Sequence, residues 1–288
     1  MRTGAGWAII LSVVFSTTAT AQNTQREFDF VRYLMAKKNF DEAAYALDAL
    51  LVKPLTTTQQ DSANYFLGNV FYNQQNLASS IAHFDLVSEA LPRLKSEAVF
   101  FSAFNHAYLG NRLEAKQRLA GFQTTDSLQT ELKLFHLAGV ALLTRDLADY
   151  DSLTAHFGES YYLLEQQKKN LREHHQRIVD QPRKSPLVAA ALSAVLPGAG
   201  RFYAGNKGQG LYTFLIASIV GLQAWEGYEK AGPRSFRFIA YGTLFCSLYI
   251  GTIWGSAFSV KFRKDQLNET IDQQILFDMH IPIRTLFH

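Results

Sequence analysis

The feature that most constrains this chain is a run of twenty-one residues, 238–258, without a single Asp, Glu, Lys, Arg or His. A helix of this length crosses a bilayer, because each residue adds about 1.5 Å and the hydrocarbon core is about 30 Å thick. The run therefore predicts a full transmembrane helix. The apolar stretch 211–225 predicts a preceding span of borderline length, so residues 185–260 are expected to form a membrane hairpin module.

A glycine-rich stretch, residues 193–210, stands just before these spans and reads SAVLPGAGRFYAGNKGQG. Glycine permits positive φ and close backbone approach, and proline ends the preceding helix. Irregular backbone at membrane depth is tolerated only where protein or water covers its polar groups. We therefore expect a tight turn of the membrane module here. The alternative is an ordinary loop between water-exposed helices, against which the long uncharged run argues.

The same stretch resembles the TM2 family of small membrane hairpins. Bacterial relatives carry the pattern lPGxGqxYxGxxxxG, often behind tetratricopeptide (TPR) repeats. The matching residues are Pro197, Gly198, Gly200, Tyr203, Gly205 and Gly210, and Phe202 forms an aromatic pair with Tyr203. One departure is that TM2 hairpins usually carry an acidic residue in the second span, whereas residues 238–258 have none. The resemblance implies a membrane location more than a defined biochemical activity.

Two further features concern the arrangement of the spans. Residues 187–196 are apolar but reach only about 15 Å as a helix, which fits a half-helix, although a crossing by residues 187–203 stays open. Gly251 and Gly255 form a GxxxG pattern, which predicts a close-packing face for a neighbouring helix that Gly221 and Ser218 would meet. The positive-inside rule does not choose clearly between the topologies.

The N-terminus has the pattern of a secretory signal. Arg2 supplies the positive charge, residues 7–15 are apolar, and Ala19-Thr20-Ala21 is an A-x-A cleavage site. Residues 1–21 are therefore expected to be a signal peptide, with an uncleaved anchor as the alternative. Either form sends the following domain across the bacterial inner membrane into the periplasm.

Residues 22–158 show internal similarity at a fixed period. Gly68, Ala103 and Gly139 follow one another at intervals of 35 and 36 residues. The pattern resembles the TPR repeat, a pair of antiparallel helices in which small residues allow close approach. A generic helical array is the alternative. The expected fold is all-α, with a TPR-like helical repeat array followed by a transmembrane helical hairpin.

Two segments have less definite patterns. Residues 159–184 are rich in Lys and Arg and predict a charged connecting helix whose basic residues, Lys168 among them, meet anionic headgroups. His174 and His175 within it are adjacent, so they point to different faces, and we expect a solvated surface rather than a metal site. Residues 261–288 are expected to be a short C-terminal tail, packed on the hairpin or disordered.

Composition narrows the function. The net charge of +3 is too small to imply nucleic acid, and the single cysteine, Cys246, excludes an intramolecular disulfide. No nucleotide-binding or hydrolase motif occurs, and neither predicted span contains Asp, Glu, Lys, Arg or His. We therefore expect no catalytic, cofactor-binding or metal-binding residues and no cofactor.

Three functional hypotheses remain. The first is a membrane-anchored periplasmic TPR-like scaffold that binds a protein or peptide partner and contacts membrane lipids. The second is an accessory factor in membrane-protein assembly or envelope maintenance. The third, a small membrane transporter or enzyme, is disfavoured by the uncharged spans.

Overall fold

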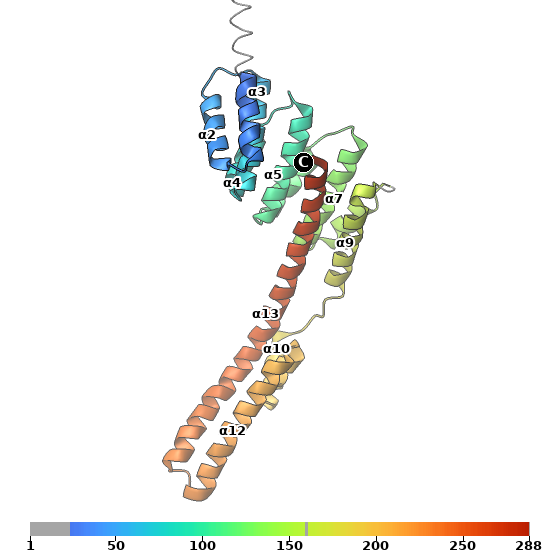
Figure 1. Cartoon of the computed structure of the whole chain (residues 1–288). Coiled ribbons are helices and arrows are strands. Elements are labelled where there is room, and N and C mark those ends of the chain that lie inside the picture. The colour runs from blue at the N-terminus through green and yellow to red at the C-terminus, as the bar shows by residue number, and fades with distance from the viewer. Residues whose placement is uncertain (1–23, 159–160, 288) are drawn as a thin grey trace, which may run out of the picture. The chain divides into compact units, whose positions relative to one another are not determined.

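The computed structural model describes residues 24–158 and 161–287, so the predicted signal peptide lies outside the described residues. Throughout these ranges the regular elements are helices, which confirms the all-α prediction. The chain divides into two units (Figure 1). Unit 1 extends to residue 175 and includes residues 275–288, and unit 2 comprises residues 176–274.

Unit 1 is a succession of helices joined by short turns (Figure 1). A helix over residues 24–36 is followed by α2 (Phe40–Leu51), α3 (Thr57–Asn73), α4 (Leu77–Asp85), α5 (Pro92–Tyr108), α6 (Arg112–Gly121), α7 (Ser127–Thr144), α8 (Leu147–Thr154) and α9 (Tyr162–Val179). Each helix packs on the next from α2 to α8, and α3, α5 and α7 also contact one another in turn.

The same tight turn recurs between the two helices of each pair. A left-handed residue is followed by an Asn or Asp at the N-cap, and the N-cap N–H donates to the carbonyl five residues earlier at 2.9 Å. The four turns are Lys38-Asn39, Gln75-Asn76, Gly110-Asn111 and Arg145-Asp146. Their spacing of 35 to 37 residues shows that the period seen in the sequence corresponds to a recurring structural unit.

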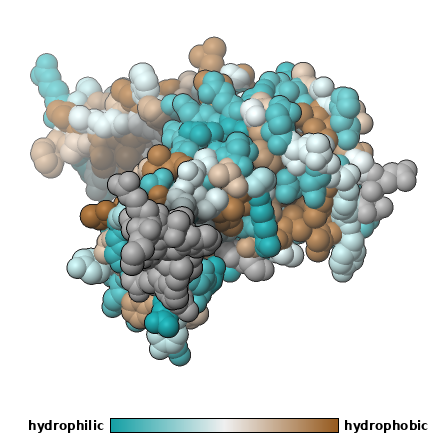
Figure 2. Space-filling view, turned by 90° about the horizontal axis from the view of Figure 1, so that it is seen from above, coloured by the Kyte–Doolittle hydropathy of each residue, from teal (hydrophilic) through white to brown (hydrophobic). Residues whose placement is uncertain are grey.

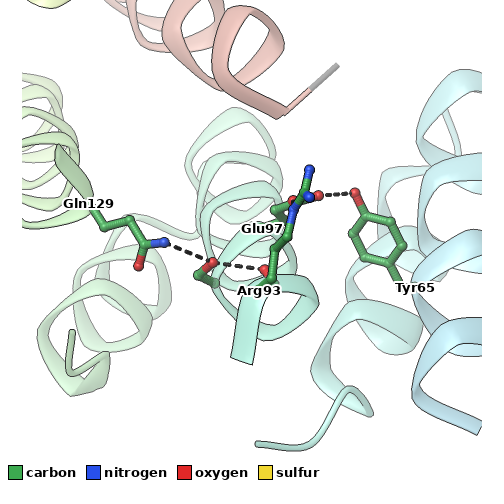
Figure 3. A network of polar contacts seen from close by, with 5 residues as sticks. Tyr65, Arg93, Glu97 and Gln129 are labelled. Atoms are coloured by element: carbon green, nitrogen blue, oxygen red, sulfur yellow. Dashed lines mark hydrogen bonds and ion pairs between the residues drawn. The ribbon is translucent and has the colours of Figure 1, made fainter. Parts of the chain in front are cut away.

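Polar contacts join equivalent positions of successive helix pairs (Figure 3). The Tyr65 hydroxyl of α3 donates to the buried Glu97 carboxylate of α5, and Arg93 donates to the other oxygen of that carboxylate at 3.1 Å. Gln129 of α7 in turn donates to Ser96 of α5 at 3.3 Å. Burial and the adjacent Glu97 charge raise the pKa of the Tyr65 phenol well above its usual range, so this tyrosine remains a neutral donor.

Unit 2 contains α10 (Pro186–Val195), α11 (Ala199–Ala204), α12 (Lys207–Ala231) and the greater part of α13 (Phe236–Phe287). The end of α12 contacts the beginning of α13, where the Tyr228 and Phe238 rings lie 5.5 Å apart. Gly221 faces the Phe245 ring further along the two helices, so within unit 2 they run side by side (Figure 1). The short connection between them contains Gly232 at φ +75°.

One helix of unit 2 has the length and composition of a membrane span. Among the described helices, α13 is the one that is long and apolar enough to cross a membrane. The predicted span 238–258 lies entirely within it. Residues 211–225, expected as a second span, lie within α12, which does not meet the same criterion of length and composition.

The segment expected to be a separate tail is the principal difference from prediction. Residues 261–287 continue α13 as helix, and residues 275–287 belong to unit 1 rather than to unit 2. The expected connecting helix also ends early, because α9 stops at Val179 and residues 181–185 are not helical. Hydrophilic and hydrophobic residues are interspersed on the face seen in Figure 2.

Candidate functional site: docking face and glycine turn

The end of α13 binds a continuous surface of unit 1, which we call the docking face. It is formed by residues of α3, α5, α7 and α9 that contact residues 275–287. Ile275, Met279 and Ile283 are each fully buried. Because these residues recur every four positions, they form one stripe of the helix, and their burial shows that this stripe meets the docking face.

A buried carboxylate fixes the register of this segment. Asp278 is 4% exposed, and its Oδ2 lies 2.8 Å from Nε2 of His174. Its Oδ1 accepts a hydrogen bond of 2.7 Å from the Asn170 side chain. Both partners come from α9, one helical turn apart, so a one-residue shift of the segment would leave a buried carboxylate without its two partners.

Aromatic contacts continue the interface along α3 and α5. The His280 ring stacks on Phe104 with a centroid distance of 4.9 Å and an interplanar angle of 12°, and it also contacts the Tyr72 hydroxyl. Near the end of the segment the Phe287 ring lies 5.7 Å from that of Phe100. His280 and Phe287 are seven positions apart, so both lie on the side of this helix that contacts α3 and α5.

The periodic small residues have two different roles. A Cβ on Gly68 would lie 2.6 Å from the Phe84 ring, so Gly68 allows α3 and α4 to approach closely, as the repeat pattern predicts. A Cβ on Gly139 would instead lie 2.5 Å from Sδ of Met279. Gly139 therefore makes room for the end of α13, a role that the sequence pattern did not indicate.

The expectation of a solvated surface around the paired histidines is wrong. His174 is buried against Asp278, and the His175 ring stacks on Tyr150 at 4.7 Å. Lys168, expected to meet headgroups, is 5% exposed and forms an ion pair with Glu131 of α7. Part of the charged segment is therefore interior to unit 1. In the described part of the chain, no group of three or more His, Cys, Asp or Glu side chains is placed to hold a metal ion.

A buried histidine lies beneath the docking face. His136 of α7 is fully buried, its ring lies near those of Phe100 and Phe135, and neither ring nitrogen has a hydrogen-bond partner among the described residues. Burial, and secondarily the charge of His280, lowers the pKa of His136 to about 3. The imidazole is thus neutral in the folded protein at neutral pH.

The glycine turn brings together most of the motif residues in unit 2. Gly198 has φ +86° and Gly205 has φ +98°, so each end of the short helix α11 is closed by a left-handed glycine. A Cβ on Gly200 would overlap the carbonyl oxygen of Ala189, and one on Gly198 would overlap that of Gly210. The structure thus shows the positive φ and close backbone approach that we expected of this stretch.

The other motif residues surround this close approach. A Cβ on Gly210 would lie 2.6 Å from the Phe202 ring, and the Tyr203 hydroxyl accepts a hydrogen bond of 3.1 Å from the Ser185 N–H. Pro197 lies in the bend between α10 and α11. The Gly200 N–H donates to Ser193, whose hydroxyl lies 2.7 Å from that of Ser256 on α13. A buried polar link therefore joins the turn to α13.

Gly251 and Gly255, the predicted packing face on α13, do not meet Gly221 among the described residues. A Cβ on Gly251 would meet nothing within 4 Å, and Gly221 faces Phe245 rather than this pair of glycines. Gly255 does face a neighbour, but the neighbour is the Arg201 side chain of α11, with Nη2 at 2.8 Å from the position of a Cβ. Gly255 therefore accommodates a guanidinium instead of a second apolar helix.

Comparisons with known proteins give no identification: no protein-family model, curated protein or solved structure matches the chain.

We predict that the Asp278 contacts stabilise unit 1. Asp278→Ala leaves the buried His174 and the half-buried Asn170 without their shared partner and should lower the free energy of unfolding by about 1–3 kcal/mol. Phe277→Ala, at a neighbouring position that is 65% exposed, is the matched control and should have little effect. Urea denaturation of the full chain in detergent measures both, and equal midpoints would contradict the role of Asp278.

We predict an acid sensitivity that originates at His136. Its folded pKa of about 3 lies below the unfolded value of 6.5, so the unfolded state takes up the proton first and stability falls as pH drops from 6.5 towards 3. His136→Leu should flatten this decline by up to about 1.4 kcal/mol per pH unit. Unfolding midpoints between pH 7 and 4 test this, and parallel curves for the two proteins would refute it.

We predict that the glycine turn does not tolerate substitution of Gly200 but does tolerate substitution of Gly208. Gly200→Ala places a methyl group into the α10 backbone and should destabilise unit 2 by about 1–3 kcal/mol. Gly208→Ala, in α12 with nothing within 4 Å of its Cβ, should accumulate like the wild type. Gly205→Val should resemble Gly200→Ala, because a β-branched residue is strained at φ +98°. The measurement is the amount of full-length protein that accumulates in the membrane fraction for each variant.

Proposed function

We propose that this chain is a membrane-anchored scaffold whose TPR-like repeat unit lies in the periplasm and binds a protein or peptide partner. The observation that carries the proposal is the docking face, on which helical residues 275–287 bury an apolar stripe and a paired carboxylate. A surface that holds one amphipathic helix in this way has the chemistry of a peptide-binding surface. The role is one of binding, without catalytic chemistry.

The TPR-like arrangement is supported by the turns and by the contacts between repeats. Four turns of the same left-handed geometry recur every 35 to 37 residues in the described part of unit 1. Side chains 33 residues apart pair between successive units, as in Lys116 with Asp149 at 2.8 Å. Arrays of this kind present one continuous surface because each repeat contacts only its neighbours.

An open pocket at one end of the docking face supplies the place for a partner. Its volume is about 720 Å³. The apolar and aromatic lining includes Met35, Phe40, Leu77, Phe104 and Tyr108, and Lys38 and Arg284 lie among the polar residues. The pocket suits a peptide that inserts an apolar side chain.

Anchoring in the inner membrane is supported by α13 and by the N-terminal sequence. The apolar part of α13 has the length and composition of a membrane span. A signal-like N-terminus favours export of the repeat unit. A reporter active only in the periplasm, fused after residue 158, should be active in cells, and activity of a cytoplasmic reporter at the same site would refute this orientation.

Photo-crosslinking in intact cells tests partner binding. A crosslinking amino acid at position 108, in the pocket, should capture a defined protein, and one at position 45 on α2, where Tyr45 is 79% exposed, should not. Met35→Glu, which places a charge in the apolar wall, should abolish the adduct, and Tyr45→Glu should preserve it. An adduct that survives Met35→Glu, or that forms equally at both positions, would contradict the proposal.

A further inference from the structure

Arg201 occupies an unusual position in unit 2. It belongs to α11, and its guanidinium lies against the α13 backbone at Gly255, only three residues before the end of the uncharged run 238–258. A side chain at position 255 would collide with Nη2. The packing of unit 2 thus holds a permanent positive charge at the margin of its apolar region.

The guanidinium has no anionic partner among the described residues. Its Nε is buried without a hydrogen-bond partner. The nearby hydroxyls of Ser193 and Ser256 are engaged with each other. The sequence contains no Asp or Glu between residues 181 and 225 or between residues 231 and 264. A cation beside apolar surface is costly unless an anion accompanies it.

Further cations gather at the same end of unit 2. Lys184 lies above the Tyr203 ring at 5.8 Å, with its Nζ 3.6 Å from the position of a Cβ on Gly205. The side chain of Asn206 donates a hydrogen bond of 2.5 Å to Ser259 of α13, so the start of α12 lies close to this part of α13. Lys207 follows Asn206, Lys261 lies two positions after Ser259, and both lysines are exposed. The start of α12 and the adjoining part of α13 therefore both contribute positive charge.

Exposed apolar side chains lie next to these cations. Val195 is 84% exposed, Leu196 is 50% exposed and Phe202 is 44% exposed, all within six residues of Arg201. Such a combination of cations and apolar surface matches the two halves of a phospholipid, because a phosphate pairs with guanidinium and ammonium groups and acyl chains cover apolar side chains.

We propose that the Arg201 end of unit 2 is a binding site for the headgroup of an anionic phospholipid. Arg201 binds the phosphate, Lys184 and Lys207 supply additional charge, and Gly255 keeps open the space that the guanidinium occupies. The site rests on the membrane anchoring proposed above, but it is independent of the peptide partner. It assigns a ligand to the glycine turn, which the sequence motif alone does not.

The test measures lipids retained by the full-length protein. Purified protein in detergent is incubated with phosphatidylglycerol or phosphatidylcholine at equal concentration, and bound lipid is counted by native mass spectrometry. Wild type should retain phosphatidylglycerol selectively. Arg201→Gln should lower that retention about tenfold, as expected for a lost charge-assisted hydrogen bond. Arg234→Gln, which removes an exposed cation from the α12–α13 connection, should leave it unchanged.

Additional arms keep the result interpretable. Circular dichroism must show that Arg201→Gln is folded, and if it is not, the double variant Lys184→Gln/Lys207→Gln replaces it, with reduced retention as the expected result. Inorganic phosphate is added as a competitor, and displacement of the lipid at millimolar phosphate would indicate a site for a free anion and overturn the proposal. Equal retention of the two lipids, or unchanged retention in the variants, would also overturn it.

This outcome is separable from the proposed scaffold function. Absence of lipid selectivity together with a crosslinked partner at position 108 would contradict the headgroup site and support partner binding. Selective lipid retention without a crosslinked partner would support the headgroup site and contradict partner binding.

Discussion

The burial of one stripe of residues 275–287 on α3, α5, α7 and α9 is the interaction on which unit 1 depends. Arrays of helix pairs usually leave the surface of alternate helices available to ligands. Here the end of the same chain fills much of that surface, with Met279 fitted against Gly139 and Asp278 held by α9. The interior of unit 1 is therefore completed by residues more than a hundred positions away from the helices they contact.

The glycine turn imposes a comparable constraint on unit 2. A left-handed glycine lies at each end of α11, and the absence of a side chain at Gly200 lets α11 approach the α10 backbone. That approach fixes where Arg201 lies, and Gly255 leaves it room on α13. The glycines of the motif are thus required by the backbone conformation of the turn, whereas Gly255 makes room for one particular side chain, that of Arg201.

Local patterns in the sequence predicted local structure well. Periodicity identified the helix pairs of residues 22–158, and glycine content identified the turn at residues 193–210, because both depend on the conformational preferences of adjacent residues. The left-handed positions Lys38, Gln75 and Arg145 were missed, although the Asn or Asp that follows each was a usable signal.

Long-range pairing could not be predicted in the same way. His174 belongs to a strongly polar helix, so its neighbours in sequence indicate a solvated surface, and only the distant Asp278 explains its burial. Residues 261–288 begin with charged residues and end with apolar ones, a pattern that does not specify a docking surface. The GxxxG pattern of α13 likewise indicates that a close approach is permitted, but not that an arginine makes it.

The docking face also limits where the proposed partner could bind. Releasing residues 275–287 would expose Ile275, Met279 and Ile283, each fully buried, at a cost of about 5–9 kcal/mol for side chains of this size. A typical domain has a total stability of only about 5–15 kcal/mol, so displacement of the segment would approach unfolding of unit 1. Under the proposed scaffold function, a partner of ordinary affinity would therefore bind beside the segment rather than replace it. The pocket between Met35 and Tyr108 meets this requirement, and because His280 and Arg284 line it, the binding surface that we propose includes the end of α13.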